Sequence, residues 1–123
     1  MIKGIGIDIT EIKRVQAAVN KHVQFIPKVL TPAEQAQLEN LSGQRYWEYI
    51  SSRFSLKESF SKAMGTGIGT QVSFQDVSFI NNDLGRPEVF QSIFSGRAHA
   101  SVSHTDQLVM TEVILEEGSD GNS

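Results

Sequence analysis

The chain has 123 residues, a length typical of one small domain, with 39% hydrophobic residues and a formal net charge of −3. It contains no cysteine, which excludes disulfides, thiolate catalysis and cysteine-ligated metal centres, and fits a reducing compartment. It has no readable secretory signal and no run approaching the roughly 18 apolar residues of a membrane helix. We therefore expect a cytoplasmic globular domain with no membrane and no nucleic-acid partner.

The N-terminal segment predicts a strand followed by a helix. Over residues 2–9, isoleucines alternate with Gly4, Gly6 and Asp8, which is the period of a strand. Apolar residues at helical spacing then predict a helix over residues 12–26. Two interpretations of the strand's glycine face stay open: it leaves room for a ligand beside Asp8, or it admits a close-packed neighbour while Asp8 caps the helix.

Two further helices follow. Thr31, Pro32 and Glu34 form a helix start with a capping box, and this helix is expected to end near Gly43. A third and longest helix is predicted over about residues 44–64, because a broad apolar face runs through it before glycines stop it.

The rest of the chain predicts short strands. They are expected at residues 72–80, 88–90, 98–104 and 108–116, separated by turn-rich segments. This order of elements favours an α+β fold, with helices packed on a mainly antiparallel sheet. We expect one domain over residues 1–116 and a flexible tail over residues 117–123.

Carboxylates and basic residues on the third helix are candidates for chemistry. Glu58 and Lys62 are one turn apart and could form only a surface ion pair. Alternatively, Glu58 and Asp8 could share a hard cation such as Mg²⁺, which takes one or two carboxylates plus phosphate oxygens. Arg53 and Lys62 would then be placed to bind phosphate. The following glycines could approach a ligand or could simply end the helix.

Two other groups have both a structural and a functional interpretation. Residues 11–30 contain four basic residues and one acidic residue, so their amphipathic helix could dock an acidic partner or could be an ordinary core helix with a solvated back. His104, near a strand end, could donate to a phosphate or lie on the surface. Its serine and aspartate neighbours lack the Gly-x-Ser-x-Gly elbow of a hydrolase, so we reject a catalytic triad there.

Three segments carry a more specific pattern. In chain order they are Gly6 to Arg14 (GIDITEIKR), Arg53 to Gly69 (RFSLKESFSKAMGTGIG) and Ser101 to His104 (SVSH). Together they resemble the holo-[acyl-carrier-protein] synthase family, and the resemblance runs over about residues 2–116. The departures are Leu56 and Ser59, which stand where the family often has alanine; the charged residues of the motif are intact.

The resemblance implies a phosphopantetheinyl transferase fold and activity. Such an enzyme transfers the phosphopantetheine arm of coenzyme A to a serine of apo acyl carrier protein, for fatty acid biosynthesis, and releases adenosine bisphosphate. The family requires a divalent metal, usually Mg²⁺, and forms a homotrimer with active sites at the subunit interfaces. Either Glu58 or a water held by the metal would take the serine proton.

The resemblance also implies residue roles. Asp8 and Glu58 would bind the metal, and Asp8, Glu58 and Lys62 would be the catalytic residues. Coenzyme A would be bound by Arg53, Lys62, Gly65, Gly67, Ile68, Gly69, Arg86, Pro87 and His104. Arg14, Lys21 and Phe25 would meet the acidic carrier protein.

Two other functions remain open. A metal-dependent phosphohydrolase could use the same carboxylates but would need no acceptor protein. A non-catalytic module could bind coenzyme A or a partner without depending on Asp8 or Glu58.

Overall fold

The computed structural model describes residues 1–118 and confirms the predicted α+β class, with helices packed on antiparallel strands. In chain order the elements are β1 (Ile2–Glu11), α1 (Ile12–Lys21), α2 (Phe25–Val29), α3 (Pro32–Leu38), α4 (Gly43–Met64), the 3-10 turn η1 (Phe74–Asp76), β2 (Val77–Asn81), β3 (Pro87–Gln91), β4 (Arg97–His104) and β5 (Leu108–Glu116).

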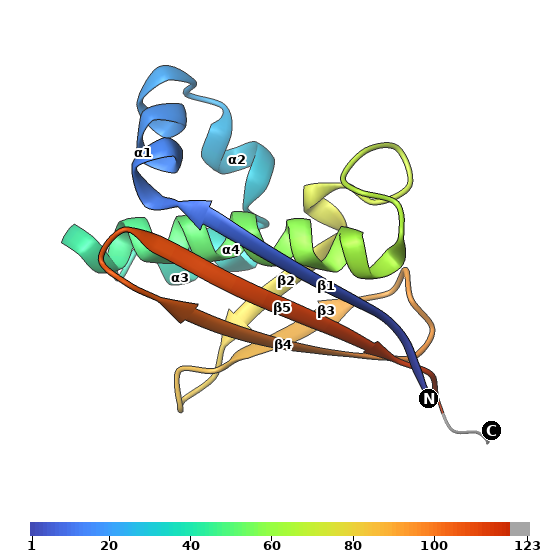
Figure 1. Cartoon of the computed structure of the whole chain (residues 1–123). Coiled ribbons are helices and arrows are strands. Elements are labelled where there is room, and N and C mark those ends of the chain that lie inside the picture. Colours follow the sequence, from blue (N-terminus) through green and yellow to red (C-terminus); the bar gives the residue numbers. More distant parts are fainter. Residues whose placement is uncertain (119–123) are drawn as a thin grey trace.

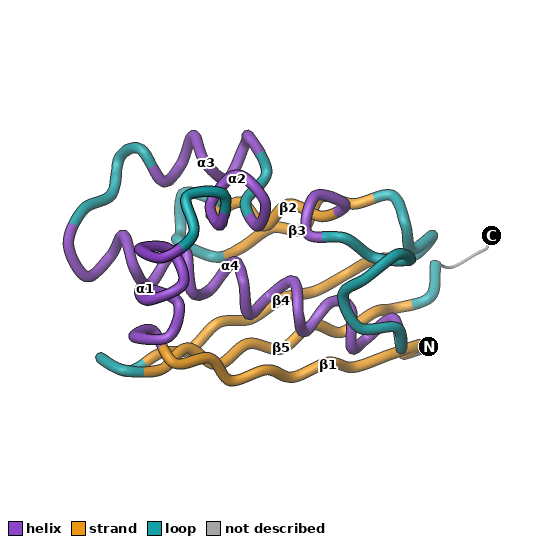
Figure 2. Tube along the Cα trace, turned by 90° about the horizontal axis from the view of Figure 1, so that it is seen from above, coloured by secondary structure: helices purple, strands orange, loops and turns teal. Residues whose placement is uncertain are grey.

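The strands form two antiparallel groups beside the long helix α4. One sheet has the order β1-β5-β4, and β2 pairs with β3 in a hairpin that lies on the β4 side (Figures 1 and 2). Helix α4 packs across β1 and β5, while α1 and α2 lie over the end of β1 (Figure 1). The register of β1 on β5 places Asp8 opposite Thr111.

The glycines of β1 allow α4 to approach its backbone closely. Gly4 and Gly6 face α4, and a Cβ atom on either would overlap the carbonyl oxygen of Ala63 or Ser59. Of the two interpretations of this face, the close-packed neighbour is therefore correct. The alternative, open space beside the glycines, is wrong, because helix backbone fills it.

The opposite face of β1 carries the isoleucines, which alternate with the glycines along the strand. Ile5, Ile7 and Ile9 are 53–59% exposed, and Met110 on the neighbouring strand β5 is 50% exposed. One side of the sheet thus packs on α4, and the other presents apolar side chains to the outside.

Helix α4 belongs to two hydrophobic cores. Leu56 and Phe60 pack with residues of β2 and β5, including Phe79 and Val113. Tyr49 and Ile50 face the other way and, with Phe54 partly buried, pack among α1, α2 and α3. Because apolar side chains surround much of the helix, α4 is held in the middle of the fold rather than on its surface.

The helix ends follow the predicted signals in two places. Thr31 and Glu34 form the expected capping box at the start of α3. Gly65 adopts a φ of 82° and ends α4, as the predicted glycine stop requires.

The prediction of one helix over residues 12–26 is wrong. Helix α1 ends at Lys21, and Val23 is 86% exposed between α1 and α2. Pro27 lies inside the first turn of α2, where its missing N–H breaks no helical hydrogen bond. The periodic spacing of apolar residues therefore continues across residues 22–24, where the helix is interrupted.

Two other element boundaries differ from the prediction, and most of the expected tail lies outside the described residues. Helix α3 ends at Leu38 instead of near Gly43, which begins α4 with a φ of 62°. Strand β2 begins at Val77, after the 3-10 turn η1. Of the expected tail, Glu117 lies 3.7 Å from Lys3 in an ion pair, and residues 119–123 lie outside the described residues. Within residues 1–118, the helices are all too short or too polar for a bilayer crossing.

Candidate active site

Asp8 faces α4 and is held by three side chains, one from β1 and two from α4. Its Oδ2 atom accepts hydrogen bonds from Thr10 Oγ1 and from Ser55 Oγ, each at 2.7 Å. Its Oδ1 atom lies 3.2 Å from Lys62 Nζ. The alternative interpretation of Asp8 as a helix cap is wrong, because Glu11 holds the N-cap position of α1. The expected surface pair of Glu58 and Lys62 is replaced by this pair of Asp8 and Lys62.

Glu58 lies on the same side of α4 as Lys62, close to Asp8. Burial and repulsion from the Asp8 carboxylate raise the pKa of Glu58, and the Lys62 ammonium partly offsets this. Within residues 1–118, we find no hydrogen bond or ion pair to the Glu58 carboxylate. The site therefore holds two neighbouring carboxylates with one ammonium, which leaves negative charge uncompensated.

The donor set fits a hard divalent cation that is shared with a substrate. Across residues 1–118, no group of three or more His, Cys, Asp or Glu residues could hold a metal by itself. Mg²⁺ rarely needs such a cage, since it binds one or two carboxylates and completes its shell with phosphate oxygens and water. Asp8 and Glu58 could supply the two carboxylates, and a cation between them would relieve the Asp8 repulsion that contributes to the raised pKa of Glu58.

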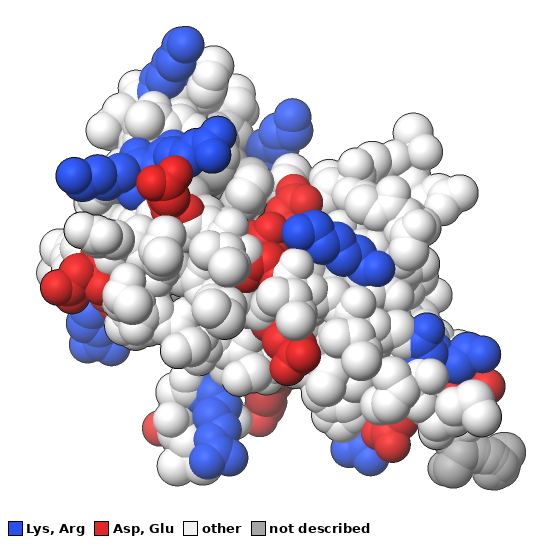
Figure 3. Space-filling view, viewed as in Figure 1, with Lys and Arg blue, Asp and Glu red and all other residues white. Residues whose placement is uncertain are grey.

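Asp8 and Glu58 line a hollow of about 400 Å³ between β1, α1, α2 and α4. Arg14 and Phe25 line the same hollow, so the structure brings two of the three predicted carrier-protein contacts to the carboxylates. Lys21 lies exposed at the end of α1, outside this lining. Figure 3 shows basic side chains gathered over the α1–α2 region, beside acidic atoms in the middle of the face.

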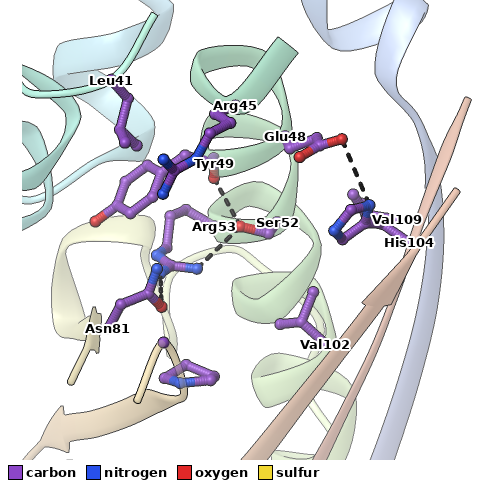
Figure 4. Close-up of a pocket in the computed structure, with 12 residues that line it drawn as sticks. Leu41, Arg45, Glu48, Tyr49, Ser52, Arg53, Asn81, Val102, His104 and Val109 are labelled. Carbon is purple, nitrogen blue, oxygen red and sulfur yellow. Dashed lines mark hydrogen bonds and ion pairs between the residues drawn. The ribbon is translucent and has the colours of Figure 1, made fainter. Parts of the chain in front are cut away.

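A second hollow, of about 270 Å³, is lined by other residues that we expected to bind coenzyme A. Arg53, Pro87 and His104 line it (Figure 4). His104 Nδ1 lies 3.4 Å from a carboxylate oxygen of Glu48. The structure thus separates Arg53, Pro87 and His104 from Asp8 and Glu58, because the two groups line different hollows of one chain.

Arg53 is buried at the base of this second hollow. Its guanidinium donates to Ser52 Oγ and Asn81 Oδ1 and lies 4.1 Å from the centre of the Tyr49 ring (Figure 4). Burial lowers the pKa of Arg53. Its Nε atom is buried with no hydrogen-bond partner in the described part of the chain.

The remaining predicted contacts are more dispersed. Gly65, Gly67 and Gly69 line a shallow depression after α4, where the loop bends back. Ile68 is partly buried and packs against the core. Arg86 lines a separate depression beside β3 and β4.

Several residues at these sites were not predicted from the sequence. Arg45 and Asn81 line the second hollow, and neither carried a motif that pointed there. Ser55 bonds directly to Asp8. A signal for Ser55 existed: Ser51, Ser55 and Ser59 recur every four residues, which places three small polar side chains on one helix face.

Comparison with known proteins shows the family of this chain. The sequence model of the 4'-phosphopantetheinyl transferase superfamily matches residues 4–115. A holo-[acyl-carrier-protein] synthase of Limosilactobacillus fermentum is 64% identical over 118 residues, which cover 96% of this chain and 99% of that protein. One of Limosilactobacillus reuteri is 61% identical over 116 residues, which cover 94% and 97%.

Solved structures agree as well. The fold matches a holo-(acyl-carrier-protein) synthase from Bacillus anthracis, in complex with CoA (3',5'-ADP), with a TM-score of 0.89 and 40% identity over 96% of this chain and 99% of that one. It also matches the Helicobacter pylori holo-[acyl-carrier-protein] synthase in complex with coenzyme A, with a TM-score of 0.81 and 28% identity over 91% and 99%. This chain therefore belongs to the 4'-phosphopantetheinyl transferase superfamily and, within it, to the holo-[acyl-carrier-protein] synthase family.

Proposed function

We propose that this chain transfers the phosphopantetheine arm of coenzyme A to a serine of apo acyl carrier protein, in the cytoplasm and for fatty acid biosynthesis. The products are holo carrier protein and adenosine 3',5'-bisphosphate. The observation that carries the proposal is the pair of adjacent carboxylates, Asp8 and Glu58, beside Lys62 in a chain 64% identical to a holo-[acyl-carrier-protein] synthase.

Asp8 and Glu58 are the residues that would hold Mg²⁺. When bound, the ion supplies charge neutralisation and orientation for the pyrophosphate of coenzyme A. Lys62 lies beside Asp8 with its side chain half exposed, so its ammonium reaches outward to neutralise phosphate oxygens. Because phosphoryl-type transfer depends mainly on positioning and charge neutralisation, these three side chains provide the chemistry that the reaction needs most.

The carrier protein is proposed to dock over the hollow that contains the carboxylates. Arg14 is exposed on α1 and would attract an acidic partner. Lys21, at the C-terminal end of the same helix, is also exposed. Phe25 and Phe54 offer apolar surface within the same hollow. A carrier bound there would bring its serine to the side of the molecule where Asp8 and Glu58 lie.

The active chain is proposed to be a homotrimer whose sites are shared between protomers. Two observations support this. The sheet face of Ile5, Ile7 and Ile9 is apolar and more than half exposed, which is costly for a free monomer. In addition, Arg53 and His104 line a different hollow from Asp8 and Glu58, which fits a coenzyme A that is held between two copies and takes one group from each.

A mixing experiment tests the shared site. Asp8→Ala removes a carboxylate from the first hollow, and His104→Ala removes an exposed group from the second. If neighbouring protomers complete one site, the two weakened variants should regain activity when they are mixed under conditions that exchange subunits. Activity that never exceeds the sum of the separate variants, in a protein that light scattering shows to be a monomer, would refute the shared site.

Transfer itself is tested by intact-protein mass spectrometry of an apo acyl carrier protein incubated with this chain, coenzyme A and Mg²⁺. We expect the carrier to gain the mass of one phosphopantetheine, and EDTA or Asp8→Ala to abolish the gain. Release of phosphopantetheine or phosphate without acceptor would favour the hydrolase instead. Binding of coenzyme A with no product on several carriers would favour the binding module.

A further inference from the structure

A chain of buried hydroxyl groups lies behind Asp8, between β1, α4 and β5. Ser55 Oγ donates to Asp8 Oδ2 at 2.7 Å and lies 2.8 Å from Thr111 Oγ1. Ser59 Oγ lies 2.7 Å from the same threonine oxygen. All three hydroxyl residues are at most 1% exposed. No part of the proposed transfer mechanism accounts for this polar chain inside the fold.

The hydrogen bonds of this chain have a single direction. An ionised carboxylate only accepts, so the one proton of Ser55 must point to Asp8. Ser55 is then left as an acceptor, and Thr111 donates to it. Ser59 in turn donates to Thr111, whose Oγ1 lies at 2.7 Å and whose carbonyl oxygen lies at 3.3 Å. A chain ordered in this way polarises each successive bond toward the carboxylate.

The same contacts restrict how the Asp8 carboxylate can turn. Oδ2 accepts from both Ser55 and Thr10, so this oxygen is occupied on the protein side. Among residues 1–118, Oδ1 has only the Lys62 ammonium as a partner, at 3.2 Å, and the Lys62 side chain is half exposed. Rotation of the carboxylate would break both short bonds of Oδ2 and leave buried hydroxyls without an acceptor.

We propose that Ser55, Thr111 and Ser59 are positioning residues that lock Asp8 with one oxygen turned out to receive a divalent cation. The inference rests on the proposed function, in which Asp8 holds Mg²⁺. Side chains that hold a metal ligand in place typically change metal affinity 10–100-fold when they are removed. The effect should decrease along the chain from Ser55 to Ser59, because each step is further from the carboxylate.

Helix α4 offers a matched control. Ser51 lies one turn before Ser55, is equally buried, and has no hydrogen-bond partner for its hydroxyl among the described residues. Ser51→Ala and Ser55→Ala therefore make the same change in the same helix at the same depth. Only the second removes a hydrogen bond to Asp8.

The test is calorimetric binding of coenzyme A over a series of Mg²⁺ concentrations, with EDTA as the metal-free reference. We expect Ser55→Ala to raise the Mg²⁺ concentration for half-maximal binding by about 10-fold. Thr111→Val, which keeps the shape but removes the hydroxyl, should raise it by a smaller factor, and Thr111→Ser should restore it. Ser51→Ala should match the wild type, and binding in EDTA should be the same in all folded variants.

Three results would overturn the inference. The first is a Ser55→Ala protein that folds and needs no more Mg²⁺ than the wild type. The second is an equal rise in Ser51→Ala. The third is a Thr111→Ser protein as impaired as Thr111→Val, which would show that keeping the hydroxyl does not preserve Mg²⁺-dependent binding. If instead the wild type shows neither transfer nor Mg²⁺-dependent binding of coenzyme A, the proposed function fails first, and this inference fails with it.

Discussion

Lys57 and Glu58 are neighbours on α4, but their charged groups have opposite surroundings. Lys57 is fully buried, and its ammonium donates to Glu34 Oε1 at 2.6 Å and to the carbonyl oxygens of Val29 and Phe74 at 2.7 Å. These three acceptors match its three protons. Glu58 faces a hollow, and burial and Asp8 raise its pKa.

The difference separates a structural charge from a functional one. Both oxygens of Glu34 are engaged as well, since they accept from Lys57 and from the backbone N–H groups of Thr31 and Phe79. This closed network ties α2, α3, η1 and β2 to α4, and because Lys57 and Glu34 are fully buried, it is not open to a ligand. Because successive residues of a helix point about 100° apart, one step along α4 turns from this closed network to the open carboxylates.

The largest effect on stability is expected at the buried pair of Lys57 and Glu34. Lys57→Met would leave the Glu34 carboxylate buried without its cation, which costs about 3–5 kcal/mol. Urea unfolding followed by circular dichroism measures this loss. A change below about 1 kcal/mol would show that the pair does not hold the fold as described.

The double variant Lys57→Met/Glu34→Gln sharpens this prediction. The single amide oxygen of Gln can accept from only one of the N–H groups of Thr31 and Phe79, which donate to different oxygens of Glu34. No uncompensated buried charge remains, however, and such a charge costs more than one lost hydrogen bond. The double variant should therefore be more stable than Lys57→Met alone. If the second substitution lowers stability further, charge compensation is not what holds this region together.

A smaller loss is expected where α4 meets the strand that carries Asp8. Gly6→Ala would place a Cβ atom against the Ser59 carbonyl, which is backbone and cannot turn away. We expect a loss of about 1–3 kcal/mol in urea unfolding. Gly69→Ala is the matched control, because no atom lies within 4 Å of its added Cβ. Equal stability of the two variants would contradict the close contact.

The smallest effect on stability is expected at Glu58, where a substitution should stabilise the fold instead of destabilising it. An acid whose pKa is raised on folding contributes stability at low pH and loses it as the pH rises through the folded pKa. Charged Glu58 therefore costs stability at neutral pH. In EDTA, Glu58→Gln should raise Tm by roughly 1–3 °C at pH 7 and by less near pH 4. A lower Tm at pH 7 would contradict the uncompensated charge.

Local signals predicted much of the fold. The capping box at Thr31 and the stop at Gly65 depend on neighbouring residues alone, so the start of α3 and the end of α4 followed from the sequence. The break between α1 and α2 did not, because Val23 fits the helical period although its side chain is exposed. Periodicity cannot reveal a break when the residues on both sides keep the same spacing.

The site depended more on tertiary packing. Asp8 and Glu58 are far apart in the chain, and spacing alone left their pairing open; only the resemblance to a known family favoured it. The predicted coenzyme A contacts are divided between two hollows because their side chains point in different directions from α4 and β4. The hydrogen bond from Ser55 to Asp8 likewise depends on the direction in which Ser55 points from α4. Neither arrangement follows from residue order.

The most direct test of the central claim compares transfer by the wild type and by Glu58→Gln, each shown to be folded by circular dichroism. The intact mass of an apo acyl carrier protein is followed over time with coenzyme A and saturating Mg²⁺. The account predicts that the wild type adds one phosphopantetheine and that Glu58→Gln is slower by about 100-fold or more. Transfer by Glu58→Gln at the wild-type rate would contradict a functional role for the open carboxylates of α4 and β1.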